Sequence, residues 1–122
     1  MKPVGTLIPI VLAAGCVSVV RPLDAPRIGS GAEVAPYAIH EECFALAAGE
    51  RISYRFTAQR PVSFNIHFHE GNTVILPIDI ASTTGESGVF AADRAQAYCL
   101  MWEAGAEGSL LDYRVQSLER RE

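Results

Sequence analysis

The sequence predicts an all-β fold, an antiparallel β-sandwich of about seven short strands that follows a signal peptide and a tether. Apolar and polar residues alternate with a period of two from Cys43 onward, which is typical of strands with one buried face. Clusters of turn residues separate these segments at intervals of about ten residues. We find no segment with the apolar spacing and end caps of an amphipathic helix of about twelve residues.

Turn chemistry separates the expected strands. A break at Arg60-Pro61 ends one alternating run, and Glu70-Gly71-Asn72 is a turn signal. Pro77 lies inside an apolar run, so that strand is expected at a sheet edge or a bulge. Residues 81–88 are expected to form a Ser/Thr/Gly loop. The expected strands lie around Cys43 and over 52–58, 62–69, 73–80, 89–91, 98–102 and 110–115.

Length and charge restrict the domain organisation and the class of partner. The 122 residues, 49% of them hydrophobic, suffice for one domain but would leave each of two domains too small to bury a useful core. The formal net charge of -4 argues against a nucleic-acid partner, because binding phosphates requires a basic face. We expect a signal peptide over 1–15, a lipidated N-terminus and flexible tether over 16–42, the β-sandwich over 43–117, and a charged tail over 118–122.

The N-terminal segment has the features of an export signal. Lys2 precedes an apolar run over 4–14, which at about eleven residues is too short to cross a bilayer. Leu12-Ala13-Ala14-Gly15-Cys16 resembles the lipobox of bacterial lipoproteins, which most often has Leu in place of Ala13. The resemblance implies cleavage before Cys16, acylation of that cysteine and, since Val17 rather than Asp follows it, a periplasm-facing position at the outer membrane. The alternative is an ordinary signal peptide with Cys16 left as a thiol.

Two further cysteines remain once Cys16 is assigned to the lipid. Cys43 and Cys99 form an even pair in a protein expected to be exported, so we expect them to form a disulfide. The chain-entropy model gives such a bridge a stabilising effect of roughly 4 kcal/mol. A reactive thiol pair and a metal site are the alternatives, although a redox pair would favour cysteines that lie closer in the sequence.

The order of motifs along the expected domain also carries information. Cys43-Phe44 opens it, alternating strands follow, and Tyr98-Cys99 comes late. This order resembles the GOLD (Golgi dynamics) β-sandwich, although two residues usually separate the Tyr from the Cys in that family. The resemblance covers residues 43–117 and implies a GOLD-like or jelly-roll-like, non-catalytic module that binds proteins or lipids.

His67 and His69 are the strongest candidate metal ligands. Residues i and i+2 of a strand share a face, so the two imidazoles could hold a metal together. A catalytic zinc normally has three protein ligands, and His40 falls in the expected tether. Because the apolar residues of 62–68 are expected to face the core, we expect both histidines to be exposed and not to form a high-affinity metal site.

No catalytic motif accompanies these features. The sequence has neither a Gly-x-Ser-x-Gly nucleophile motif nor a Gly-rich phosphate loop. We therefore expect a lipid-anchored envelope protein that is not an enzyme, needs no cofactor, and binds another envelope protein or a lipid. The alternative is a periplasmic metal-binding lipoprotein that uses His67 and His69.

Overall fold

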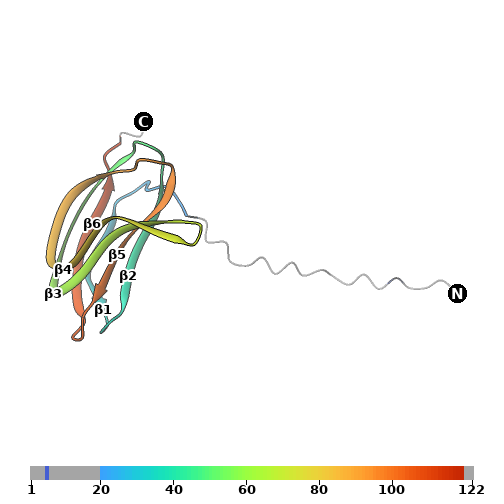
Figure 1. Cartoon of the computed structure of the whole chain (residues 1–122). Helices are drawn as coiled ribbons and strands as arrows, with labels where there is room; N and C mark the ends of the chain where they lie inside the picture. Colours follow the sequence, from blue (N-terminus) through green and yellow to red (C-terminus); the bar gives the residue numbers. More distant parts are fainter. Residues whose placement is uncertain (1–4, 6–19, 120–122) are drawn as a thin grey trace.

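The computed structural model describes residue 5 and residues 20–119 and is an all-β protein (Figure 1). The prediction of an antiparallel all-β fold is confirmed, because every pairing between its strands is antiparallel. Within the described residues, no helix is long and apolar enough to cross a membrane. The strands are β1 (Arg27–Val34), β2 (Ile39–Leu46), β3 (Arg51–Glu70), β4 (Thr73–Ala91), β5 (Gln96–Ala104) and β6 (Ser109–Ser117).

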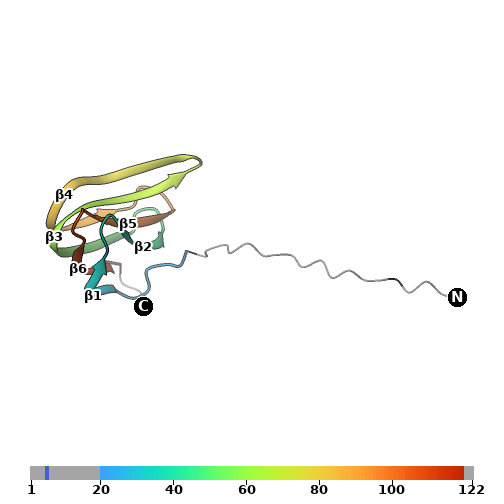
Figure 2. The same cartoon turned by 90° about the horizontal axis from the view of Figure 1, so that it is seen from below.

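The long hairpin formed by β3 and β4 organises the fold (Figures 1 and 2). β4 pairs with one edge of β3, while the other edge pairs with β6 over 52–58 and then with β5 over 62–67. The hairpin therefore belongs to two layers. The first layer contains β1, β6 and the start of β3 with the end of β4; the second contains β2, β5 and the end of β3 with the start of β4. This strand order is that of a jelly roll.

Six strands replace the expected seven, because two expected breaks lie inside continuous strands and β1 adds a strand that was not expected. β3 continues through Arg60-Pro61 at the point where its partner changes from β6 to β5. Pro61 has no N–H to donate. The backbone groups of Arg60 bond instead to the buried Ser109, whose hydroxyl accepts from the Arg60 N–H and donates to its carbonyl, both at 2.9 Å. Residues 81–88, expected to be a loop, belong to β4, which as an edge strand accommodates Pro77 as expected.

The core lies between the two layers. Alternate residues of β3 point into it on both sides of the bend, as the period-two pattern predicts. Aromatic rings fill its centre: Phe56 and Phe64 have centroids 4.6 Å apart, and Trp102 stacks on Tyr113 at 4.9 Å. Fully buried side chains include Phe44, Ile52, Val62, Phe64, Ile66, Tyr98, Leu100, Trp102, Leu111 and Val115.

The structure corrects the assignment of residues 16–42 to a flexible tether, as far as these residues are described. β1 pairs with β6, and β2 pairs with β5 from Ile39 onward. The chain is already bound before β1: the N–H of Ala45 donates to the carbonyl of Arg21 at 2.9 Å, Pro22 bridges to Ala45, and Leu23 is buried. Backbone pairing holds these glycine- and proline-rich residues, whose side chains show little alternation.

Candidate functional site

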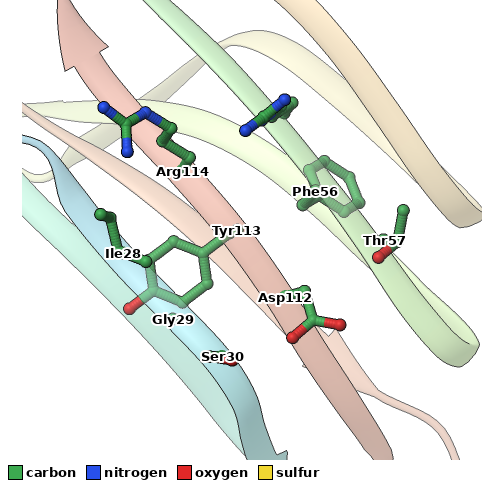
Figure 3. A pocket seen from close by; sticks show the side chains of 9 residues that line it. Ile28, Gly29, Ser30, Phe56, Thr57, Asp112, Tyr113 and Arg114 are labelled. Atoms are coloured by element: carbon green, nitrogen blue, oxygen red, sulfur yellow. The ribbon is translucent and has the colours of Figure 1, made fainter.

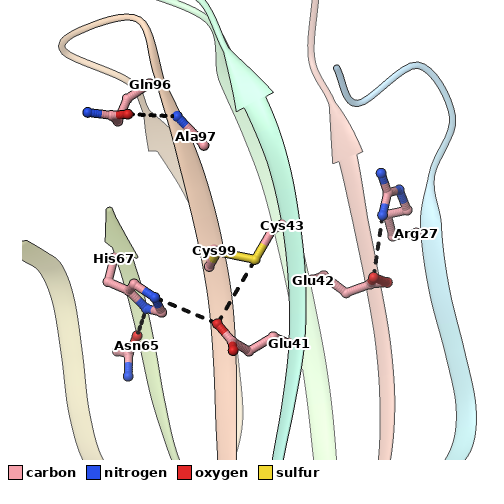
Figure 4. The surroundings of a disulfide bond; sticks show 9 residues. All are labelled: Arg27, Glu41, Glu42, Cys43, Asn65, His67, Gln96, Ala97 and Cys99. Atoms are coloured by element: carbon pink, nitrogen blue, oxygen red, sulfur yellow. Dashed lines mark hydrogen bonds and ion pairs between the residues drawn. A yellow bond between two sulfur atoms is a disulfide. The ribbon is translucent and has the colours of Figure 1, made fainter. Parts of the chain in front are cut away.

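The predicted disulfide is present and joins two neighbouring strands (Figure 4). Cys43 of β2 and Cys99 of β5 stand directly opposite each other in the antiparallel register, with Cα atoms 4.1 Å apart. Both lie on the outer face of the second layer, since their neighbours Phe44 and Leu100 point into the core. The lipid-attachment residue Cys16 lies outside the described residues.

His67 lies beside this disulfide and is buried, which corrects the expectation that it is exposed. Its imidazole Nδ1 lies 2.7 Å from Oδ1 of Asn65, and its Nε2 lies 3.6 Å from Oε2 of Glu41 (Figure 4). Because a carbonyl oxygen only accepts, Nδ1 carries the proton and donates it. Burial lowers the pKa of His67, with Glu41 opposing this shift and His69 adding to it, so the ring is neutral near pH 7. The alternation placed His67 on the correct face, but groups on neighbouring strands cover it.

The donors around His67 do not form a ready metal centre in the described part of the chain. The ring of His69, which is exposed, lies 5.3 Å from that of His67 and nearly perpendicular to it. The closest grouping of three possible ligands there is Glu41, Cys43 and Cys99. Its two sulfur atoms are bonded to each other, so neither is a thiolate, the form in which cysteine binds metals. This geometry does not test metal binding by the histidine pair, which stays the alternative to the expected absence of a high-affinity site.

The third histidine, His40, is part of the domain and not of a tether. Its ring lies against Trp102 and Tyr113, and its Nε2 lies 2.9 Å from the Tyr113 hydroxyl. That hydroxyl donates to Glu42 at 3.0 Å, and Glu42 also forms an ion pair with Arg27 at 3.4 Å. Burial, followed by the bond to Glu42, raises the pKa of Tyr113 to about 12. These contacts tie β1, β2 and β6 together where the two layers meet.

A hollow on the outer face of the first layer is the candidate ligand site that the sequence did not indicate (Figure 3). It has a volume of about 420 Å³ and lies where a bulge between Gly29 and Ala32 interrupts the pairing of β1 with β6. The bulge includes Gly31 with φ of 60°, whose N–H donates to Asp112 at 2.7 Å. The hollow is lined by Ile28, Gly29, Ser30, Arg55, Phe56, Thr57, Asp112, Tyr113 and Arg114.

Two arginines on neighbouring strands line this hollow. Arg55 of β3 and Arg114 of β6 are direct cross-strand partners, and like charges in that position are destabilising. Arg114 donates to the side chain of Gln116 at 3.0 Å, and the described residues place no carboxylate within 4.0 Å of either guanidinium. Both arginines also line an adjoining hollow of about 560 Å³ that contains Ser53 and Ser87.

The arginine pair is therefore suited to an anion. A guanidinium presents a planar set of donors that matches a carboxylate or a phosphate, and the nearby serine and threonine hydroxyls add further donors. Asp112 also lines the hollow, and its carboxylate accepts the Gly31 N–H and keeps its negative charge, so an anion is expected on the arginine side of the hollow. The alternation predicts that Arg55 points outward. The pairing of β3 with β6, which brings Arg114 opposite Arg55, cannot be predicted from the sequence of either strand alone.

Comparison with known proteins adds no functional assignment to this geometry. No protein-family model and no curated protein matches the chain.

Proposed function

We propose that this chain is a lipid-anchored, non-catalytic binding module of the bacterial cell envelope, attached through Cys16 at the periplasm-facing side of the outer membrane. It binds an anionic group, a carboxylate or a phosphate, of another envelope protein or a lipid. The observation that supports this function is the pair formed by Arg55 and Arg114 in the hollow of the first layer.

The arginine pair is hard to explain as a stabilising feature. Cross-strand pairs contribute roughly 0.2–1 kcal/mol, and like charges reverse the sign of that contribution. The chain as a whole is acidic, with a formal net charge of -4, so two neighbouring cations with no carboxylate paired to them among the described residues stand out within the sheet. A bound anion removes the repulsion and uses both guanidinium groups.

The proposed location rests on two features of different kinds. The segment Leu12–Cys16 resembles a lipobox, and the disulfide between Cys43 and Cys99 suits an oxidising compartment such as the periplasm. Acylation is tested by the mass of the N-terminal peptide, which should begin at a lipid-modified Cys16. An unmodified cysteine or a mature chain that begins elsewhere would contradict the anchor.

Anion binding is tested by titrating the mature protein in detergent with phosphate and with acetate, following backbone amide shifts by NMR. We expect saturable shifts around Arg55 and Arg114 and binding weakened about tenfold by Arg55→Gln or Arg114→Gln. The control is Arg60→Gln, because the guanidinium of Arg60 pairs with Glu107 at 3.2 Å outside the hollow. Stronger binding of phosphate favours a lipid or phosphorylated partner, and stronger binding of acetate favours an acidic protein. Equal binding by all three variants would refute the site.

A second candidate function is metal binding at His67, and one observation favours it. Since Nδ1 of His67 donates to Asn65, its Nε2 presents a lone pair to Glu41 at 3.6 Å. Two acceptors that face each other are stabilised by a cation between them. Zinc and copper titrations of the mature protein beside His67→Ala and His69→Ala test this role. Submicromolar affinity that both substitutions remove would support it, whereas affinity that survives them would exclude these ligands.

A further inference from the structure

The position at which the chain enters the domain limits the distance between domain and lipid. Arg21 and Pro22 are attached to β2 through Ala45, and Leu23 is buried. Between Cys16 and the first residue of this described stretch, Val20, stand only Val17, Ser18 and Val19. Four peptide steps span at most about 14 Å even when fully extended. A lipid on Cys16 therefore holds this end of the domain close to the bilayer surface.

The strands meet at this end in a row of small, apolar and imidazole side chains, which we call the anchor row. Pro22 bridges to Ala45, Ala45 pairs with Ala97, and His69 pairs with Val74. β3 and β5 pair up to His67 opposite Cys99, so the same register brings His69 beside Ala97. The side chain of Gln96 supports this placement by donating to the His69 carbonyl at 3.3 Å.

The anchor row lies on the outer face of the second layer. Ala45 and Ala97 lie two residues from Cys43 and Cys99 along β2 and β5, so they point to the same outer face as the disulfide. The residues that alternate with them in both strands are buried. With neighbouring strands about 4.8 Å apart, the four steps from Pro22 to Val74 span about 19 Å. The row, at about 19 Å, is wider than the distance of at most about 14 Å by which the link to Cys16 can separate the domain from the lipid.

The far end of the row is apolar and exposed. Val74 is 45% exposed and Leu76 is 43% exposed, both at the start of β4 just after the hairpin turn. In the two adjoining turns Arg94 forms ion pairs with Glu70 at 2.7 Å and with Asp93 at 3.4 Å. These charges are therefore partly compensated where the corner approaches lipid headgroups.

We infer that the anchor row, together with Leu76, rests on the phospholipid surface to which Cys16 is attached. The inference depends on the proposed acylation of Cys16. The sequence predicts a long spacer that holds the domain off the membrane, whereas in this inference the domain lies against the bilayer. The hollow of Arg55 and Arg114 is on the outer face of the other layer, so it points away from this leaflet. Its anion therefore comes from a partner other than the lipid beneath the anchor row.

Depth-dependent fluorescence quenching tests this orientation. The mature lipidated protein, as Val74→Trp, is reconstituted in phosphatidylethanolamine/phosphatidylcholine vesicles with or without lipids brominated near the headgroup. The wild type supplies the background, because Trp102 is fully buried. The matched control is Ala106→Trp, an exposed position in the turn between β5 and β6 at the opposite end of the domain. We expect the Val74→Trp emission to be largely lost and the Ala106→Trp emission to be unchanged.

The outcomes separate the inference from the function on which it rests. The mass of the N-terminal peptide is measured on the same samples, and an unmodified Cys16 would remove the anchor itself. A lipidated chain in which both reporters are quenched equally, or neither is, would overturn the orientation alone. Inserting a flexible Gly/Ser segment of about twenty residues between Val19 and Val20 should restore the Val74→Trp emission, since such a segment reaches about 25 Å. Undiminished quenching in that variant would show that the short link does not set the orientation.

Discussion

Replacing Gly29 by alanine should destabilise the domain by about 1–3 kcal/mol through a single steric conflict. A Cβ atom at Gly29 would overlap the ring of Tyr113, with which this residue pairs across β1 and β6. The approach to the Cδ1 atom would be 2.6 Å, closer than Cβ atoms come to other heavy atoms. The Gly29 backbone is not in the left-handed region, so the ring and not the dihedral angles makes glycine necessary.

Tyr113 cannot move aside without breaking other contacts. Its ring stacks on Trp102 at 4.9 Å, and its hydroxyl is bonded to Glu42 at 3.0 Å and lies 2.9 Å from Nε2 of His40. A shift of the ring therefore disturbs the core and leaves the Glu42 carboxylate with one partner fewer. The upper end of the estimated destabilisation comes from this hydrogen bond, because losing a hydrogen bond to a charged group costs about 1.5–3 kcal/mol.

Urea unfolding followed by Trp102 fluorescence measures the effect, and a double-mutant cycle identifies its cause. In a Tyr113→Leu background the substitution Gly29→Ala should cost much less, because the atoms that conflict are gone. Gly31→Ala is the contrasting variant: nothing lies within 4 Å of its Cβ, but its φ of 60° makes a side chain cost about 1–2 kcal/mol in either background. If Gly29→Ala changes the free energy of unfolding by less than about 0.5 kcal/mol, the packing argument is refuted.

Three further predictions concern charge, the disulfide and pH. Arg55→Gln should raise the free energy of unfolding by up to about 1 kcal/mol, because it relieves the repulsion across β3 and β6, and a loss of stability would contradict that view. Replacing Cys43 and Cys99 together by alanine should lower it by up to about 4 kcal/mol in the same assay, and no change would contradict the loop-closure account. Burial lowers the pKa of His67 from 6.5 in the folded state, so stability is complete above pH 6.5 and declines as the pH falls below it. His67→Gln should flatten that slope and His69→Ala should keep it, and equal slopes in both variants would refute the assignment.

The strands of the core were predictable because their signal is local. The alternation from Val62 to Phe68 fixes which residues face inward, and the structure places them there. The same argument missed β1, in which Gly29 and Gly31 interrupt any pattern and Ile28 is exposed. β1 is held by backbone pairing with β6, and such pairing leaves no mark on the composition of the strand.

The candidate sites depend on register, which no single segment contains. Alternation shows that Arg55 points outward, but only the pairing of β3 with β6 places it opposite Arg114. The prediction that His67 is exposed was wrong for a related reason. Its face was correctly predicted, yet the cover comes from neighbouring strands, with Glu41 and the disulfide beside it.

A single strand, β3, links the two proposed functions of the domain. Its first half carries Arg55 in the first layer, and its second half ends at His69 in the anchor row of the second layer. The bend between them is secured by Ser109, whose hydroxyl bonds to both backbone groups of Arg60. Because the strand is continuous, the angle between the anchor row and the hollow of Arg55 and Arg114 is set by this bend and by the packing of the core. In the proposed orientation on the membrane, an anion in the hollow would be held at a fixed height and direction above the lipid, which a domain on a flexible spacer could not achieve.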